Sequence, residues 1–473
     1  MAAGQVEPSK TVKLTMPKPL AGLTKWIDPP KFDLDSYIAN YRGKTRFYRL
    51  CLIGQCSAYL QLEALKAAVA EAKKGKNVDD YDYAVNALRD ASPDDPDAII
   101  DTTWRLKTMK HVNAETERLE NELKGYKNNL IKESIRMGHE DLGAWYHQTG
   151  NLLLATKAYA RMRDYCTTPA HMNFMQLRVI EVSIDRGDWM AVQSNVTKIR
   201  NLSEGSNKLE PKLSTAMGLS HLAGSSYKEA AKDFLNTPTS LGDSFNNFIT
   251  PNDVAVYGGL CALATMNRTE LQEKVLDNAS FRNFLELEPH IRRAISFFVK
   301  CRYTQCLELL NAYKNDYHLD LHLQRHITKI YGEIRDKSIV EYFVPFSSIR
   351  LESMASSFPG DRPIKDEMVE MIQNGLLDAR IDSPANLLIK HKVDPRMMAY
   401  EGTIAKAEGY KQALRMRLLH MNMVEAGLVV QPPKKGGPGG QEALGRGAGV
   451  GDVMIAGQGG HGMSRTWRDA EHI

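Results

Sequence analysis

Apolar residues recur with a helical period in two neighbouring stretches between Lys337 and Asn374. The first stretch has apolar side chains at i, i+3, i+4 and i+7, namely Leu351, Met354, Ala355 and Phe358. Pro359-Gly360 interrupts this pattern, and the second apolar stripe consists of Ile364, Met368, Met371 and Ile372. Gly375 tolerates the left-handed conformation that ends many helices, so we predict two consecutive helices, the second of which ends there.

Beyond Gly375 the period changes from about 3.6 residues to 2, which indicates β-strands. Asp382-Ser383-Pro384 has the composition of a turn between two short strands. The predicted strand positions are Leu377, Ala379, Ile381, Leu387, Leu388 and Ile389. Two helices followed by a β-hairpin predict a winged helix over residues 336–396. An exposed strand edge can pair with a strand of another chain, so we predict that these six residues form a partner-binding edge.

A longer pattern repeats along residues 136–335. Eight positions of its first copy match tetratricopeptide spacing: Leu142, Gly143, Tyr146, Gly150, Leu152, Ala155, Tyr159 and Met162. Gly143 and Ala155 are small enough for two helices to cross closely, and Tyr159 fills the gap between them. The Ala155 position recurs at Val192 and Ala230, at periods of 37 and 38 residues, and a fourth copy contains Cys306. These observations predict a mainly α fold, in which a tetratricopeptide-like solenoid is capped by the winged helix.

The segments on either side of the solenoid differ from it in composition. Residues 32–135 are predicted to form an N-terminal helical region, with one long helix from about Ala98 to Lys132. Residues 1–31 contain five prolines before Lys31 and few large apolar side chains, and residues 429–473 are rich in glycine. We expect both ends of the sequence to be disordered because they cannot bury enough apolar surface to order a backbone.

Residues 397–428 predict one more helix, whose apolar positions are spaced for packing on other helices. Ala407, Leu414, Met421 and Leu428 lie seven residues apart, which is heptad spacing. Lys411 and Glu425 interrupt the accompanying line of apolar residues. We predict a partner-binding seam that consists of Ala407, Leu414, Leu418, Met421 and Leu428.

The amino-acid composition indicates a chain that can form a sizeable core and whose positive and negative charges nearly balance. The 473 residues are 43% hydrophobic and carry a net charge of +4, which is small for a surface built to bind polyanions. The six cysteines include no C-x-x-C pair. No signal-peptide pattern and no run of about 18 apolar residues occurs, so we expect an intracellular protein with reduced thiols.

Candidate catalytic chemistry is sparse. His318, His322 and His326 have an i, i+4, i+8 spacing that could place two imidazoles on one helix face for zinc, but a solvated, histidine-rich face explains them better. The sequence contains neither an H-E-x-x-H motif nor an H-x-H pair, and the latter is needed by metal-dependent isopeptidases of the MPN type. We therefore predict no catalytic residue, no metal site and no cofactor.

A winged helix also raises the alternative of DNA binding. Its second helix would enter the major groove. That helix, over residues 361–374, has four acidic residues against Arg362 and Lys365, a net charge of −2. Because phosphates would repel this helix, and Arg380, Lys390 and Lys392 are too few to compensate, binding through the strand edge is favoured over nucleic-acid binding.

A helical solenoid that ends in a winged helix resembles the PCI domain of proteasome-lid, signalosome and initiation-factor-three scaffolds. Over roughly residues 33–425 the chain resembles the family of COP9 signalosome subunit 1. The stretches that carry this resemblance are Ile131 to Arg136, Asp141-Leu142-Gly143, Tyr257 to Ala264, Phe284 to Pro289 and Gly375 to Ser383.

The resemblance implies a non-catalytic scaffold. Such a subunit would join sister PCI and MPN subunits through its winged-helix edge and a C-terminal helical bundle. The complex removes a ubiquitin-like modifier from the cullins of cullin–RING ligases, and its zinc isopeptidase lies on another subunit. Members of the family work in the cytoplasm and the nucleus, with no role in membranes. The equivalent subunit of the proteasome lid stays open as an alternative.

Overall fold

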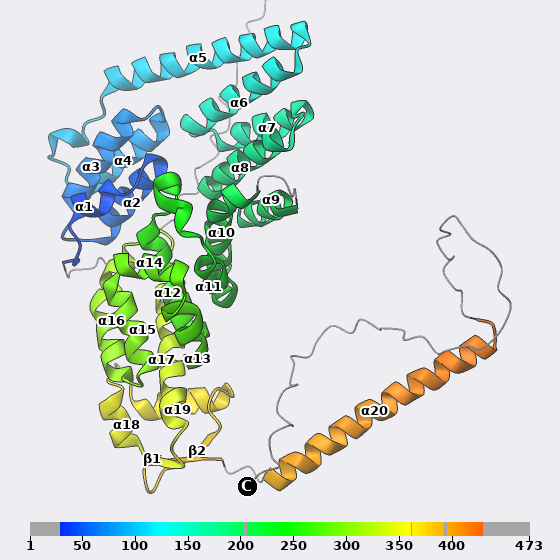
Figure 1. The fold of residues 1–473 in the computed structure, drawn as a ribbon. Coiled ribbons are helices and arrows are strands. Elements are labelled where there is room, and N and C mark those ends of the chain that lie inside the picture. Colours follow the sequence, from blue (N-terminus) through cyan, green and yellow to red (C-terminus); the bar gives the residue numbers. More distant parts are fainter. Residues whose placement is uncertain (1–28, 202–205, 361, 392–394, 429–473) are drawn as a thin grey trace, which may run out of the picture. The chain divides into compact units, whose positions relative to one another are not determined.

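The computed structural model describes residues 29–201, 206–360, 362–391 and 395–428 (Figure 1). The predicted disordered ends fall almost entirely outside these residues. The chain divides into two compact units, residues 1–391 and residues 392–473. Among the described residues, no helix is long and apolar enough to cross a membrane.

The first unit starts with four short helices that share a core of their own. They are α1 (Leu34–Ala39), α2 (Gly43–Cys56), α3 (Gln61–Lys74) and α4 (Val78–Ala91), followed by a 3-10 turn η1 (Pro96–Ala98). The long helix α5 (Thr102–Asn129) begins where the Asp101 carboxylate accepts the backbone N–H of Trp104 at 3.0 Å. The prediction that this helix continues to Lys132 is wrong: Leu130 adopts a left-handed conformation with φ of 56°, and a new helix starts at Lys132.

Helical pairs then follow one another, as the repeat pattern predicted. They comprise α6 (Lys132–Gln148), α7 (Leu152–Met162), η2 (Arg163–Tyr165), α8 (Pro169–Arg186), α9 (Trp189–Asn201), α10 (Ser206–Ala223) and α11 (Tyr227–Leu235). The expected contact of Gly143 with Tyr159 is confirmed, because a Cβ on Gly143 would lie 2.7 Å from the Tyr159 ring. A Cβ on Gly218 would lie 2.7 Å from the Phe234 ring two repeats later, so the two helix pairs pack in the same way, a glycine against an aromatic ring.

The second half of the solenoid contains a π-helical turn and several short helices. Its elements are η3 (Thr239–Phe245), α12 (Pro251–Thr265), α13 (Arg268–Leu271), η4 (Gln272–Leu276), α14 (Ala279–Leu287), α15 (Pro289–Val299), α16 (Tyr303–His318) and α17 (Ile327–Phe343). α12 is buried on nearly all sides, and α16 ends at His318. The expected helix carrying His318, His322 and His326 is therefore wrong: residues 319–326 form a turn between α16 and α17.

The winged helix completes the first unit. It consists of β1 (Ser348–Arg350), α18 (Leu351–Ser357), α19 (Ile364–Gln373), β2 (Ala379–Asp382) and β3 (Leu387–Lys390). The two helices and the hairpin are confirmed, but the sequence pattern missed β1, which makes the sheet three-stranded in the order β1-β3-β2. Leu377, Leu388 and Met368 share one continuous core with Ile330 and Ile334 of α17, so the winged helix caps the solenoid.

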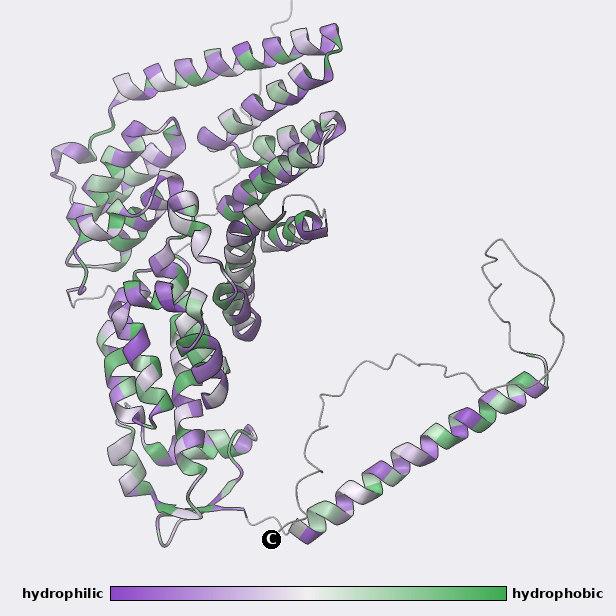
Figure 2. Cartoon of the chain, in the orientation of Figure 1, coloured by the Kyte–Doolittle hydropathy of each residue, from purple (hydrophilic) through white to green (hydrophobic). Residues whose placement is uncertain are grey.

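The described part of the second unit is one helix, α20 (Pro395–Glu425). Its 31 residues confirm the predicted C-terminal helix. Large hydrophobic residues occur along its whole length (Figure 2).

Candidate assembly surfaces

The sheet offers a more restricted edge than the sequence predicted. β3 pairs antiparallel with β1 on one side and with β2 on the other, so its backbone groups are engaged within the sheet. The prediction that Leu387, Leu388 and Ile389 form a free edge is therefore wrong for these three residues. β2 is an outer strand, and the edge available for pairing includes Ala379 and Ile381.

The apolar side chains of the hairpin mostly face the core. Leu377 is 4% exposed, Leu388 is fully buried and Ala379 is buried as well. Ile389 and Leu376, by contrast, are substantially exposed. An aspartate at position 377 or 388 would break the core that joins the winged helix to the solenoid, so it would not test the edge selectively.

Proline substitutions on β2 separate edge pairing from folding. Alternate residues of an antiparallel outer strand direct their N–H groups away from the neighbouring strand. Arg380 and Ile381 are consecutive, so the N–H group of one faces β3 and that of the other faces outward. Arg380→Pro and Ile381→Pro are therefore made as separate variants. We expect the variant whose substituted N–H faces outward to keep the parent melting temperature. In that variant recovery of partner subunits should fall about tenfold, because the proline cannot donate a main-chain hydrogen bond to a partner strand and its ring obstructs that strand. Circular dichroism and quantitative co-purification measure both properties. Parent-level recovery in the well-folded variant would argue against pairing through β2.

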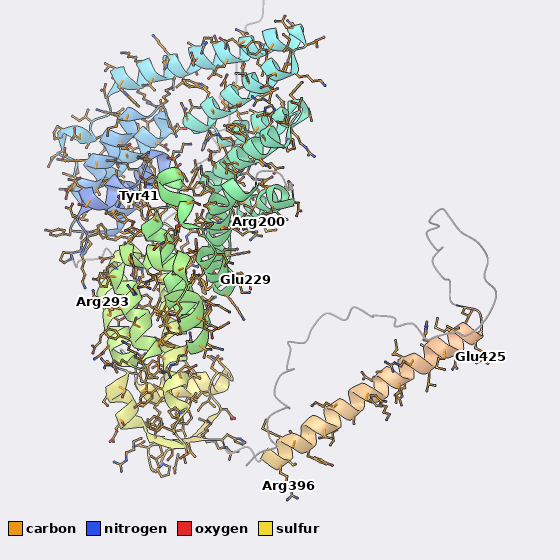
Figure 3. The ribbon with its side chains drawn as sticks, viewed as in Figure 1. Tyr41, Arg200, Glu229, Arg293, Arg396 and Glu425 are labelled. Atoms are coloured by element: carbon orange, nitrogen blue, oxygen red, sulfur yellow. The ribbon has the colours of Figure 1, made fainter. Side chains whose placement is uncertain are left out.

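The predicted seam on α20 is open to solvent within the described residues. Leu414, Leu418, Met421 and Leu428 are 41 to 69% exposed, and Ala407 is exposed as well. Met416, Leu419 and Met423 add exposed apolar side chains outside the seam. Side chains project all around the helix between the labelled Arg396 and Glu425 (Figure 3). A helix that is apolar on several sides is typical of the interior of a multi-helix bundle.

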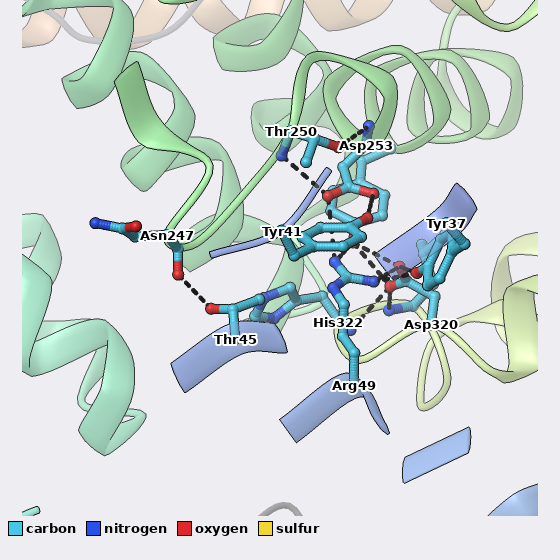
Figure 4. Close-up of polar contacts among 11 residues, drawn as sticks. Tyr37, Tyr41, Thr45, Arg49, Asn247, Thr250, Asp253, Asp320 and His322 are labelled. Atoms are coloured by element: carbon cyan, nitrogen blue, oxygen red, sulfur yellow. Dashed lines mark hydrogen bonds and ion pairs between the residues drawn. The ribbon is translucent and has the colours of Figure 1, made fainter. Parts of the chain in front are cut away.

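A buried ionic cluster joins the first helices to the solenoid (Figure 4). The Arg49 side chain on α2 is fully buried. Its guanidinium lies 3.2 Å from a carboxylate oxygen of Asp253 on α12 and 2.5 Å from Asp320 in the α16–α17 turn. Tyr41 donates to Asp253 at 2.6 Å, and Tyr257 donates to Asp320 at 2.8 Å. Two carboxylates thus share one arginine, and tyrosine hydroxyls donate further hydrogen bonds to them.

The electrostatics of this cluster suit a structural role. Burial opposes the charged form of Asp320, but Arg49 and the backbone N–H of Leu323 outweigh it, so the Asp320 pKa lies below its usual value. Burial, followed by repulsion from Arg49, lowers the pKa of His322 to about 4. His322 is therefore neutral at physiological pH. Among the described residues, no three His, Cys, Asp or Glu side chains are arranged to hold a metal ion.

The sequence analysis missed Arg49 and its two carboxylate partners. One signal was present: Arg49 is the single charge inside the run Phe47 to Cys56, which is otherwise dominated by apolar residues. A charge in such a run is either snorkelling or paired in the interior. Its partners could not have been named, because they lie 204 and 271 residues away along the chain.

Comparisons with known proteins agree with this architecture. Residues 101–274 match the family described as 26S proteasome subunit RPN7, and residues 310–392 match the PCI domain. The chain is 53% identical to COP9 signalosome complex subunit 1 of Emericella nidulans, over 87% of this chain and 86% of the relative. It is 42% identical to the protein of that name in Neurospora crassa, over 85% and 92% of the two chains. With the 26S proteasome non-ATPase regulatory subunit 6 of Oryza sativa the identity is 22%, over 63% and 77%.

Proposed function

The chain belongs to the family of COP9 signalosome complex subunit 1, and we propose that it is a non-catalytic scaffold subunit of that complex. The observation that carries this proposal is an identity of 53% over more than four-fifths of both chains. The much lower identity to the proteasome subunit favours the signalosome over the proteasome lid. The winged helix and the exposed α20 supply two surfaces through which such a scaffold would hold its neighbours.

The partners follow from this role. The chain joins sister subunits of the PCI and MPN types, with the β2 edge pairing to a neighbouring winged helix and α20 entering a shared helical bundle. The complex removes the ubiquitin-like modifier from cullins and so regulates cullin–RING ubiquitin ligases. Its zinc isopeptidase belongs to another subunit, which agrees with the absence of an H-x-H pair from this sequence. The chain works in the cytoplasm and the nucleus.

Affinity purification of the tagged chain from its native cells, followed by mass spectrometry, tests the proposal. We expect several PCI subunits and an isopeptidase subunit, with cullin–RING ligases at lower yield, and the purified material should remove the modifier from cullins in a chelator-sensitive reaction. The tag alone serves as control. Recovery of proteasome particles would assign the scaffold to the lid, and recovery of the chain alone or with chromatin would contradict the proposal.

A further inference from the structure

The end of α18 is bound by side chains of the solenoid. The last carbonyl groups of a helix have no partner within that helix. The Ser357 carbonyl accepts the hydroxyl of Thr304, on α16, at 2.8 Å. The carbonyls of Phe358 and Pro359 each accept an N–H of the Arg335 guanidinium, on α17, at 3.0 Å. Three successive carbonyls of the winged helix are thus bound by two residues of the solenoid.

The same guanidinium also binds α19. Arg335 Nε donates to one oxygen of the Glu367 carboxylate at 2.6 Å, and Nη2 donates to the other oxygen at 3.0 Å. This parallel pair needs the planar fork of arginine, which a lysine cannot reproduce. The two side chains are 20% and 19% exposed, so water screens the pair only in part. A Cβ on Gly360 would lie 2.8 Å from Nη2, which shows how closely the backbone surrounds the guanidinium. One side chain of α17 therefore contacts both helices of the winged helix.

Apolar packing is incomplete beside this contact. A cavity of about 270 Å³ lies between the start of α16, the end of α17 and the end of α18. Thr304, Tyr342, Ser357 and Phe358 are among the residues that line it. The cavity has room for several water molecules of about 30 Å³ each, so side chains do not fill the space beside the end of α18. Because apolar contacts have no preferred direction and hydrogen bonds do, the polar contacts are the ones that can fix how α18 is oriented here.

We propose that Arg335 is a positioning residue for assembly. It fixes the angle between the winged helix and the solenoid, and so sets the direction in which β2 is presented to a sister subunit. β2 belongs to the sheet of the winged helix and shares its core, so it follows the orientation of α18 and α19. A fixed angle preorganises the β2 edge, which lowers the entropy that is lost when a neighbour binds. The inference rests on the proposed scaffold function.

Distances between two spin labels on the full-length chain test the angle directly. Asn311→Cys places one label on the exposed side of α16, and Ser383→Cys places the other in the turn between β2 and β3. Cys166→Ser and Cys301→Ser remove the native thiols that are not buried. Double electron–electron resonance then gives the distribution of distances between the solenoid and the winged helix.

Two variants of the contact and one control are compared in this background. Arg335→Lys keeps the charge and removes the fork, and Glu367→Gln keeps the shape and removes the charge. Arg362→Lys is the matched control, because Arg362 pairs with Glu370 of α19 at 3.7 Å and both side chains are mostly exposed. Circular dichroism and thermal unfolding check that each variant is folded.

In the parent and the control, we expect one narrow distribution of label distances. Arg335→Lys and Glu367→Gln should each broaden it about twofold at unchanged helix content, because the directional contacts are lost and the apolar core remains. Recovery of sister subunits from native cells should fall about tenfold with these two variants, since their β2 edge is no longer preorganised.

An unchanged distance distribution in both variants would overturn the proposal, because the core alone would then fix the angle. Parent-level recovery of sister subunits despite a broadened distribution would overturn it as well. The distances are measured on the chain without its partners, whereas recovery by the parent reports the scaffold function. Failure of this inference is therefore distinguishable from failure of that function.

Discussion

Replacing Arg49 by alanine is expected to lower the free energy of unfolding of the first unit by about 3–5 kcal/mol. The substitution leaves Asp253 and Asp320 buried without their cation, and it opens a cavity beneath the Tyr41 ring. An uncompensated buried charge is among the largest single effects a substitution can have. Hydrogen exchange of amides in α2 and α12 should report the loss directly, and thermal unfolding gives its overall size.

Arg282→Ala is the matched control. Arg282 is more than half exposed, and its contact with Glu286 at 3.8 Å belongs to a class of surface pair worth about 0–1 kcal/mol. A second test combines Arg49→Ala with Asp320→Asn, which removes one of the two carboxylate charges that lose their cation. We expect this double variant to be less destabilised than the sum of its single changes, since the two residues form one network. If Arg49→Ala behaves like Arg282→Ala, the cluster does not hold the first helices to the solenoid.

Placing aspartate at both Leu414 and Leu418 is expected to remove the chain from its complex while residues 29–391 stay folded. Each leucine contributes about 1.5–3 kcal/mol when it is buried, and a charge in a bundle interior costs more than the lost burial. A combined loss of about 3–6 kcal/mol corresponds to a decrease in affinity of at least a hundredfold. Both side chains are exposed in the isolated chain, so its own fold does not depend on them.

The control for this prediction lies on the other side of α20. Gln412→Asp with His420→Asp adds the same number of acidic groups away from the seam. Because exposed apolar residues such as Met416 and Leu419 also lie on that side, we expect a clearly smaller loss of co-purification than in the seam variant. Removing only the residues after Pro432 should likewise leave assembly intact. Quantitative mass spectrometry of the co-purified subunits measures each variant, and melting temperature monitors the fold. Equal loss in the seam and control variants would show that charge, and not seam packing, limits assembly.

The two helices of the winged helix, the hairpin and α20 could all be predicted from the sequence, because their apolar residues repeat at a fixed local period. The pairing of Gly143 with Tyr159 could be predicted for the same reason: a small residue and a ring recur at a set spacing in each helical pair. These features are local, so a few consecutive turns or strand positions contain the whole signal. The end of α5 was misplaced because the break at Leu130-Ile131 contains neither glycine nor proline.

Only the tertiary structure decided which strand is central and which side chains form the ionic cluster. β1 has three residues, too few to show a period, yet its pairing with β3 turns a free edge into the middle of a sheet. Arg49, Asp253 and Asp320 come from three distant segments, and although the apolar run around Arg49 indicated burial, no local pattern showed which carboxylates pair with it. Whether these side chains form an ionic cluster depends on their burial and on contacts between residues more than 200 positions apart. The packing of the helices sets both, and no local pattern does.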